Sequence, residues 1–358
     1  MEHMNTPITI IGSGYVWKFV SQKLLEDYSV KKISAREIWW VSGILTNRFA
    51  DKVAHIFSDR ETVRSVVEKV KNWERVVFAG KTWPLLDQLV HTIETECPEQ
   101  INHFYILWAN GFQLYGDAPR LVLNHAIKEE QIQWEKSPTP FTHSRKSYLY
   151  QPNPSEFDEE FVKELGFDVE LTSDKNVFLK ALYLKCCINT IYNSICISNG
   201  PYIEQALQYF SPDFIDKAVS ELHQTIDHLA PGILSEDEIQ QEIDYVKEQV
   251  PHAIPSSVRQ FWRKENGRDI ADYQNSDVSL LLAWILRYAQ KNNIETPTLL
   301  NLMEEILWRG NRYNWAHNGP DWEHLHLWEK KNRTWFAQPA GVNGLNEPDF
   351  FWINTGVK

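Results

Sequence analysis

The chain has 358 residues, of which 43% are hydrophobic, and its formal net charge is −12 with no block of basic residues. This length favours two domains, and the acidic balance disfavours nucleic acid and an anionic membrane surface as main partners. A disulfide framework and a structural zinc site are also disfavoured, because no paired C-x-x-C spacing joins the four cysteines, Cys97, Cys186, Cys187 and Cys196.

The N-terminus up to Pro7 is short and polar, unlike a signal or transit peptide. No stretch contains the roughly 18 apolar residues that a membrane span needs. We therefore predict a cytoplasmic protein whose cysteines are buried thiols.

The first 173 residues alternate short apolar runs with stretches of helical spacing. Strands are predicted at 8–11, 37–41, 75–79, 104–108 and 168–171, and helices at 15–28, 63–70, 85–95 and 159–165. Residues 121–150 have a weaker pattern, which Pro138 and Pro140 interrupt, and the Pro-rich stretch 151–157 predicts a loop. This alternation predicts a parallel sheet with crossover helices.

From residue 174 the pattern becomes helical. Helices are predicted at 177–197, 212–229, 236–250, 277–292 and 299–308, and no strand is predicted. We therefore divide the chain into an α/β domain at 1–173, an all-α domain at 174–307 and a tryptophan-rich extension at 308–358.

A glycine turn, Gly12-Ser13-Gly14, follows the first strand, and Tyr15 opens the next helix. In a dinucleotide-binding turn, the first glycine permits the tight bend and the second lets the backbone approach a pyrophosphate. The helix N-terminus then stabilises the phosphate charge. The third position, which is usually small, is Trp17. The turn predicts a Rossmann-type dinucleotide-binding domain, with a tight turn that binds no ligand as the alternative.

The second predicted strand ends at Val41, and Ser42 and Gly43 follow it, without the Asp or Glu that binds the ribose hydroxyls in NAD-dependent folds. Arg48 follows and could pair with a 2′-phosphate, which favours NADP(H) over NAD. The alternative for Arg48 is a solvated surface charge. The predicted cofactor contacts in this region are Gly12, Ser13, Gly14, Tyr15, Ser42 and Arg48.

A polar stripe interrupts the apolar helix predicted at 177–197. Lys185, Asn189 and Asn193 stand at i, i+4 and i+8, so the three side chains share one helix face. Such a stripe is costly among apolar neighbours unless it faces a site. Partial desolvation would lower the pKa of the lysine, which suits a general acid near neutral pH. The alternative is a solvated stripe whose asparagines cap neighbouring groups.

These residues carry a resemblance to a known family. The K-x-x-x-N-x-x-x-N pattern resembles the second-domain signature of the ketopantoate reductases (2-dehydropantoate 2-reductases). Further similar motifs follow in the family's order over about residues 8 to 306: Gly80-Lys81-Thr82, Trp108-Ala109-Asn110-Gly111, Phe161 to Leu171, Ser256-Ser257, Asp269 and Tyr273 to Leu300.

The resemblance implies a fold, a reaction and a set of residue roles. The fold is a Rossmann-type domain followed by an all-α domain of the 6-phosphogluconate dehydrogenase C-terminal type. The reaction is hydride transfer from NADPH to the keto carbon of a 2-oxo acid, with Lys185 as the general acid. Lys81 and Asn110 would organise the cofactor side, and the substrate would contact Asn110, Asn189, Asn193, Ser257 and Asp269.

The sequence also departs from the family pattern. Trp17 replaces a glycine, Asp269 stands where the family has glutamate, and Ile254 replaces a frequent polar substrate contact. Residues 126–150 show little of the family's strand pattern. The alternatives are therefore a catalytically idle relative that acts as a binding or regulatory module, and an imine or opine-type reductase. The sequence leaves a homodimer open.

Tryptophans recur in the extension at intervals of six or seven, at Trp308, Trp315, Trp322, Trp328 and Trp335. Gly310, Gly319 and Pro320 exclude one continuous coiled coil. The tryptophans would attach the extension to the body or cover a partner interface, or would form a lid over the active site. His324 and His326 have no third ligand nearby in the sequence, so no metal is predicted.

Overall fold

The computed structural model describes residues 8–11, 60–79, 83–107, 111–113, 115–122, 146–165, 168–199, 202–249, 251, 255–265, 268–271 and 277–306. It forms two compact units. Among the described residues, the first unit contains the chain up to Leu107 and Gln113–Ala181. The second contains Gly111, Phe112 and the chain from Leu182 onward.

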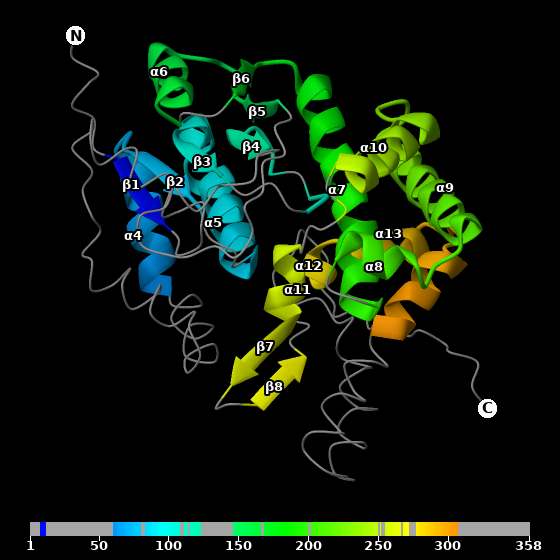
Figure 1. The fold of residues 1–358 in the computed structure, drawn as a ribbon. Helices are drawn as coiled ribbons and strands as arrows, with labels where there is room; N and C mark the ends of the chain where they lie inside the picture. The colour runs from blue at the N-terminus through cyan, green and yellow to red at the C-terminus, as the bar shows by residue number, and fades with distance from the viewer. Residues whose placement is uncertain are drawn as a thin grey trace. The chain divides into compact units, whose positions relative to one another are not determined.

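The first unit is built on a six-stranded sheet, coloured from blue to green in Figure 1. Its described strands follow the chain in spatial order: β1 (Ile8–Ile11), β2 (Arg75–Phe78), β3 (Phe104–Ile106), β4 (Arg120–Val122), β5 (Ser147–Tyr150) and β6 (Val169–Thr172). All neighbouring pairs are parallel except β4 and β5, which are antiparallel. β2 and β3 are fully buried, as is typical of strands covered on both faces.

In the described part of the first unit, four helical elements accompany the sheet: α4 (Arg60–Lys71), α5 (Trp83–Glu96), the 3-10 helix η2 (Pro98–His103) and α6 (Glu156–Leu165). Apolar side chains at helical spacing on α4 and α5 pack in one cluster with β2 and β3. Its members include Val63, Val66, Val67, Val70, Leu86, Leu89, Val90, Ile93, Phe78 and Phe104. The burial of this stripe, rather than helix propensity, holds α4 and α5 against the sheet.

A buried carboxylate fixes the start of α6. The Tyr105 hydroxyl donates to Asp158 Oδ1 at 2.6 Å, and the backbone N–H and the hydroxyl of Ser155 donate to Oδ2 at 2.8 and 2.6 Å. Asp158 therefore caps the first turn and ties it to β3 at the same time. This capping explains why α6 begins at Glu156, three residues before the helix predicted from apolar spacing.

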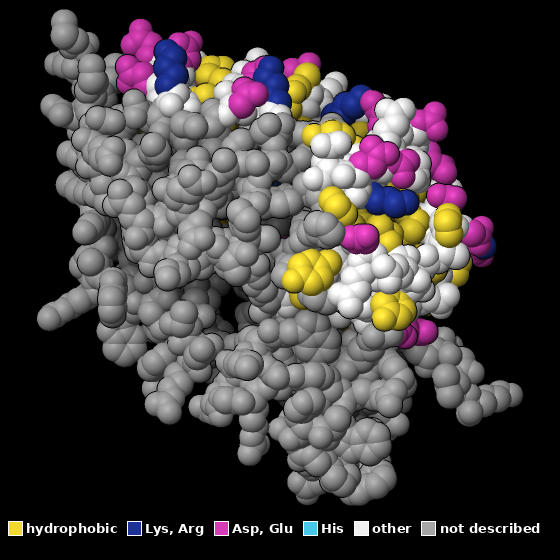
Figure 2. Space-filling model, viewed as in Figure 1, with side chains coloured by type: hydrophobic (Ala, Val, Ile, Leu, Met, Phe, Trp, Pro, Cys, Tyr) yellow, Lys and Arg dark blue, Asp and Glu magenta, His cyan; other side chains and the backbone are white. Residues whose placement is uncertain are grey.

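The second unit is dominated by helices: α7 (Lys175–Asn199, which begins in the first unit), α8 (Ile203–Leu207), α9 (Pro212–Leu229), α10 (Glu236–Gln249), α11 (Ser256–Phe261), α12 (Asp277–Leu280), α13 (Leu282–Lys291) and helical residues 297–306. Each of the nine residues from Thr190 to Ser198 on α7 is buried. Acidic side chains are frequent on the surface of α9 and α10 (Figure 2), in keeping with the negative net charge.

Most predicted elements are confirmed, including β1, β2, β3, β6 and α9. The strand and helix predicted at 37–41 and 15–28 lie outside the described residues. The prediction of no strand after residue 174 is wrong, because β7 (Trp262–Glu265) and β8 (Arg268–Ala271) form an antiparallel hairpin. The helix predicted at 277–292 is two helices, separated at Leu281.

Within the described parts of the chain, no helix has an apolar run long enough to cross a bilayer. All four cysteines are buried, as predicted, and none of them forms a disulfide.

Replacing Glu221 by alanine is expected to lower the free energy of unfolding by about 1 to 2 kcal/mol. Its two carboxylate oxygens, on α9, accept from the backbone N–H groups of Thr298 and Leu299 at 2.8 and 2.9 Å, so Glu221 caps helical residues 297–306. Urea unfolding measures the loss. Glu221→Gln keeps one acceptor oxygen and should lose less, whereas equal stability of Glu221→Ala and the parent would contradict the capping role.

Candidate functional site

Three parallel strands end level with one another in the first unit. The register places Ile11 of β1 opposite Phe78 of β2, and Phe78 opposite Ile106 of β3. The chain segments that follow these three strands therefore leave the sheet at the same edge. In open α/β sheets, ligands bind outside the carboxyl ends of the strands, so this edge is the candidate cofactor site.

The sequence places the predicted cofactor residues directly after these strands. Gly12, Ser13, Gly14 and Tyr15 follow β1, Lys81 follows β2, and Asn110 follows β3. These residues, together with Ser42 and Arg48, lie outside the described part of the chain, so their roles stay predictions. α5 begins at Trp83, five residues after the end of β2, so that one helix N-terminus follows this edge closely.

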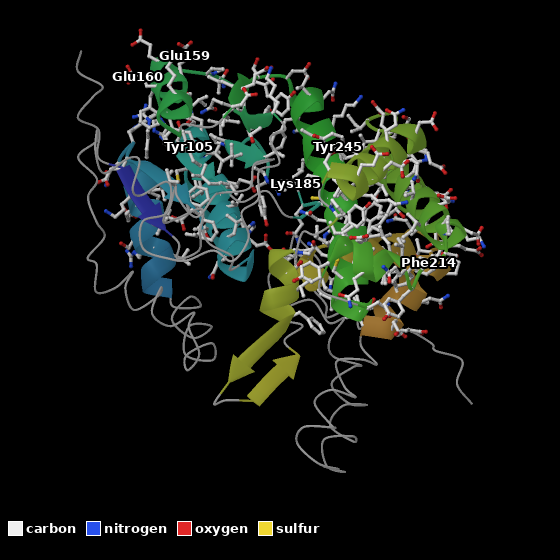
Figure 3. All side chains as sticks on the ribbon, viewed as in Figure 1. Tyr105, Glu159, Glu160, Lys185, Phe214 and Tyr245 are labelled. Carbon is white, nitrogen blue, oxygen red and sulfur yellow. The ribbon has the colours of Figure 1, made fainter. Side chains whose placement is uncertain are left out.

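The polar stripe predicted from the sequence lies on α7, where all its positions are helical. Lys185 and Asn189 are half-buried and Asn193 is buried at 7% exposure. Figure 3 shows Lys185 projecting from the middle of this helix. Leu182 and Cys186, which flank the lysine on the helix, are completely buried. The structure thus puts the lysine and both amides on one helix face among apolar neighbours.

The described residues after Asn110 pack against the turn of α7 that carries Lys185. The Gly111 backbone N–H donates to the sulfur of Cys186 at 3.4 Å, and Gly111 has a φ of +127°, which other residues rarely adopt. The Phe112 ring lies 6.1 Å from the ring of Tyr183 on α7 and stacks at 5.4 Å on Trp284 of α13. Gly111 and Phe112 are therefore joined to the lysine helix by contacts with Tyr183 and Cys186, which lie on either side of Lys185 in the sequence.

The predicted substrate residues Ser257 and Asp269 lie on α11 and β8 of the second unit. The Ser257 side chain is completely buried, and its hydroxyl has no hydrogen-bond partner among the residues that the structure describes. A buried hydroxyl without a partner is costly, and a polar ligand group would remove that cost. Asp269 pairs with Lys264 in the hairpin register, and only its backbone is described.

Phe112 and Trp284 are features of this region that sequence reasoning did not identify. Their contact joins residues far apart in the sequence, and no short motif announces it. Among the described residues, no group of three or more His, Cys, Asp or Glu side chains could hold a metal ion. His324 and His326 lie outside the described residues.

No protein-family profile matches the chain, and no curated protein sequence matches it. Solved structures do match. D-mandelate dehydrogenase, in a ternary structure with NADH and anilino(oxo)acetate, is 13% identical, and the match covers 86% of this chain and 99% of that one, with a TM-score of 0.53. This chain therefore has the fold of that dehydrogenase, a Rossmann-type domain followed by a helical domain.

Ketopantoate reductases share the same fold. A ketopantoate reductase family protein from Ralstonia eutropha is 14% identical over 86% of this chain and 99% of that chain, with a TM-score of 0.55. The 2-dehydropantoate 2-reductase from Methylococcus capsulatus is 13% identical over 85% and 98%, with a TM-score of 0.52. The resemblance to this family that the sequence motifs indicate thus extends to the fold of nearly the whole enzyme chains.

Proposed function

We propose that the protein is an NADPH-dependent reductase of the ketopantoate reductase type, which acts on a 2-oxo acid or a related carbonyl compound. The observation that carries the proposal is the packing of Gly111 and Phe112 onto the turn of α7 that holds Lys185. Gly111 and Phe112 follow β3 and Asn110 in the sequence, and the helix onto which they pack carries the lysine and the two amides of the family's pattern. The shared fold of the reductases and the dehydrogenase supports the same assignment.

In this proposal the side chains of the second unit bind the substrate and supply a proton. The bound nicotinamide cofactor supplies the hydride that reduces the carbonyl carbon. Lys185 Nζ donates a proton to the carbonyl oxygen as negative charge develops there, and its positive charge stabilises that oxygen in the transition state. Asn189 and Asn193 orient the substrate along the same helix face, and Ser257 and Asp269 hold its polar groups.

We propose NADP(H) as the cofactor. Ser42 and Arg48 support this choice because neither is the acidic residue that binds the ribose hydroxyls of NAD, and Arg48 could pair with the 2′-phosphate. Lys81 and Asn110 would complete the cofactor side. The cytoplasm is the proposed compartment, supported by the four buried thiols.

NADPH is expected to quench the tryptophan fluorescence of the protein with a dissociation constant in the micromolar range. NADH should bind at least about tenfold more weakly if Arg48 pairs with the 2′-phosphate, a difference of about 1.4 kcal/mol. Arg48→Ala should remove that preference and leave NADH binding unchanged. Absence of binding at millimolar NADPH would contradict the reductase proposal.

The alternative is a catalytically idle member of the fold that acts as a binding or regulatory module. Trp17 favours it, because this large side chain stands where a dinucleotide-binding turn usually has glycine. Under this alternative NADPH does not bind, and the extension from residue 308 serves as an interface.

A further inference from the structure

A row of stacked aromatic rings runs from α13 to α7 in the second unit. Trp284 and Tyr288 stand four residues apart on α13, and their rings stack with centres 5.3 Å apart and an interplanar angle of 11°. Trp284 also stacks on Phe112, with 5.4 Å between the ring centres and an angle of 19°. The Phe112 ring in turn lies 6.1 Å from the ring of Tyr183. The row therefore ends on the helix that carries Lys185.

The outer end of this row is tied to a third helix, α9. The Tyr288 hydroxyl and His228 Nδ1 form a hydrogen bond of 3.0 Å, and the two rings meet edge to face. The Trp284 side chain is half-buried, whereas Phe112 and Tyr183 are almost completely buried. Trp284 therefore has one stacked neighbour on its own helix, which α9 holds in place, and another in the segment that follows β3.

Phe112 supplies the side-chain packing of the short segment that follows Asn110. Its neighbour Gly111 has no side chain, and apart from the adjoining residues no described atom lies within 4 Å of the place where a Cβ would stand. The hydrogen bond from the Gly111 N–H to the Cys186 sulfur is weak, because sulfur is a poor acceptor. Stacked aromatic pairs, by contrast, stabilise a structure beyond the burial of their area. The rings therefore hold this segment more firmly than the bond to Cys186 does.

We propose that Trp284 is a positioning residue that acts through Phe112 to hold the segment after Asn110 against the turn of α7 that carries Lys185. Asn110 precedes Phe112 by two residues, so a displaced Phe112 ring also displaces the chain next to Asn110. A misplacement of about 1 Å can lower a reaction rate about a hundredfold. The consequence for catalysis rests on the proposed function, whereas the hold on the segment does not.

Hydrogen–deuterium exchange of peptides that cover residues 107–113 tests the hold without any ligand. Trp284→Leu removes the ring but keeps an apolar side chain, and because Trp284 is half-buried the variant is expected to fold. Exchange in these peptides should be about two- to tenfold faster than in the parent, the factor that corresponds to one aromatic pair. Parental exchange rates in folded Trp284→Leu would overturn the proposal.

Two further variants show whether the ring itself is responsible. Trp284→Phe keeps an aromatic ring at this position and should recover most of the protection. Tyr209→Leu is the matched control, since it removes an aromatic ring that is 65% exposed in the same unit, and residues 107–113 should then exchange as in the parent. Equally fast exchange in Trp284→Phe and Trp284→Leu would mean that ring stacking does not hold the segment.

A double variant tests the route through Phe112. Phe112→Leu and Trp284→Leu each break the same stacked pair, so the second change should add little once the first is made. The double variant should therefore exchange no more than about twofold faster than the more affected single variant. Exchange factors that multiply in full would mean that Trp284 acts independently of Phe112, which contradicts the proposal.

Kinetic measurements connect the hold to the proposed reaction, with rates expressed per NADPH-binding site so that loss of folded protein does not count. In Trp284→Leu, kcat should fall about tenfold or more, while the dissociation constant for NADPH stays within about threefold of the parent value, since the phosphate contacts are predicted after β1. Trp284→Phe should restore kcat to within about threefold of the parent value. An unchanged kcat in Trp284→Leu would overturn the link to catalysis. If NADPH fails to bind at all, the proposed function fails, and the exchange results still decide whether Trp284 holds the segment.

Discussion

Replacing Lys185 by alanine is expected to lower the turnover of NADPH-dependent carbonyl reduction by at least about a hundredfold, the lower end of what a general acid contributes. The lysine lies in the middle of α7, half-buried, and shares its helix face with Asn189 and Asn193. Its removal deletes both a proton donor and a positive charge near the developing alkoxide. Because the cofactor contacts are predicted on the first unit, NADPH affinity should change by less than about threefold, a difference of under 1 kcal/mol.

Two further variants separate chemistry from structure in this experiment. Lys185→Arg keeps the charge but donates its proton poorly, so turnover should stay low. Lys180→Ala changes an exposed lysine on the same helix, and its turnover should equal that of the parent. Unchanged turnover in Lys185→Ala would remove this lysine from the mechanism, whatever the NADPH affinity.

Phe112→Ala is expected to lower the free energy of unfolding by about 3 to 5 kcal/mol, as for other fully buried phenylalanines. The ring is 1% exposed and lies between Tyr183 on α7 and Trp284 on α13. Its removal leaves a cavity bordered by two aromatic rings, which cannot both move into it. Guanidinium unfolding followed by far-UV circular dichroism measures the loss.

Phe112→Leu is the control for this prediction, since it keeps most of the apolar volume and should cost less than about half as much. A loss below about 1 kcal/mol in Phe112→Ala would mean that the surrounding side chains close the cavity, and that Phe112 does not fix the segment against α7.

The sequence allowed the buried strands and the long helices to be predicted, since these carry the strongest apolar periodicity. α9 runs over the predicted residues, because Ser211 caps it and Pro212 opens it. The three-residue strand β4 could not be predicted in the same way. It begins at Arg120, a buried charged residue whose guanidinium donates to the backbone carbonyl of Gln113 and lies over the Tyr115 ring.

The sequence does carry a signal for the hairpin β7–β8. Asn266-Gly267, a pair typical of two-residue hairpin connections, separates the two strands. In the candidate site, the spacing of Lys185, Asn189 and Asn193 was sufficient to place them on one face, because a helix fixes that geometry locally. Phe112 could not be found from spacing, since its contacts with Tyr183 and Trp284 depend on residues brought together by the fold.

The complete burial of α7 from Thr190 to Ser198 limits how this protein can change over evolutionary time. Inserting or deleting a single residue in that stretch would rotate every following side chain by about 100° and shift it by about 1.5 Å along the axis. Because every face of this stretch is packed, no exposed side could absorb such a rotation. We therefore expect this part of the helix to tolerate substitutions but not insertions or deletions. Related sequences should keep the spacing of eight residues between Lys185 and Asn193.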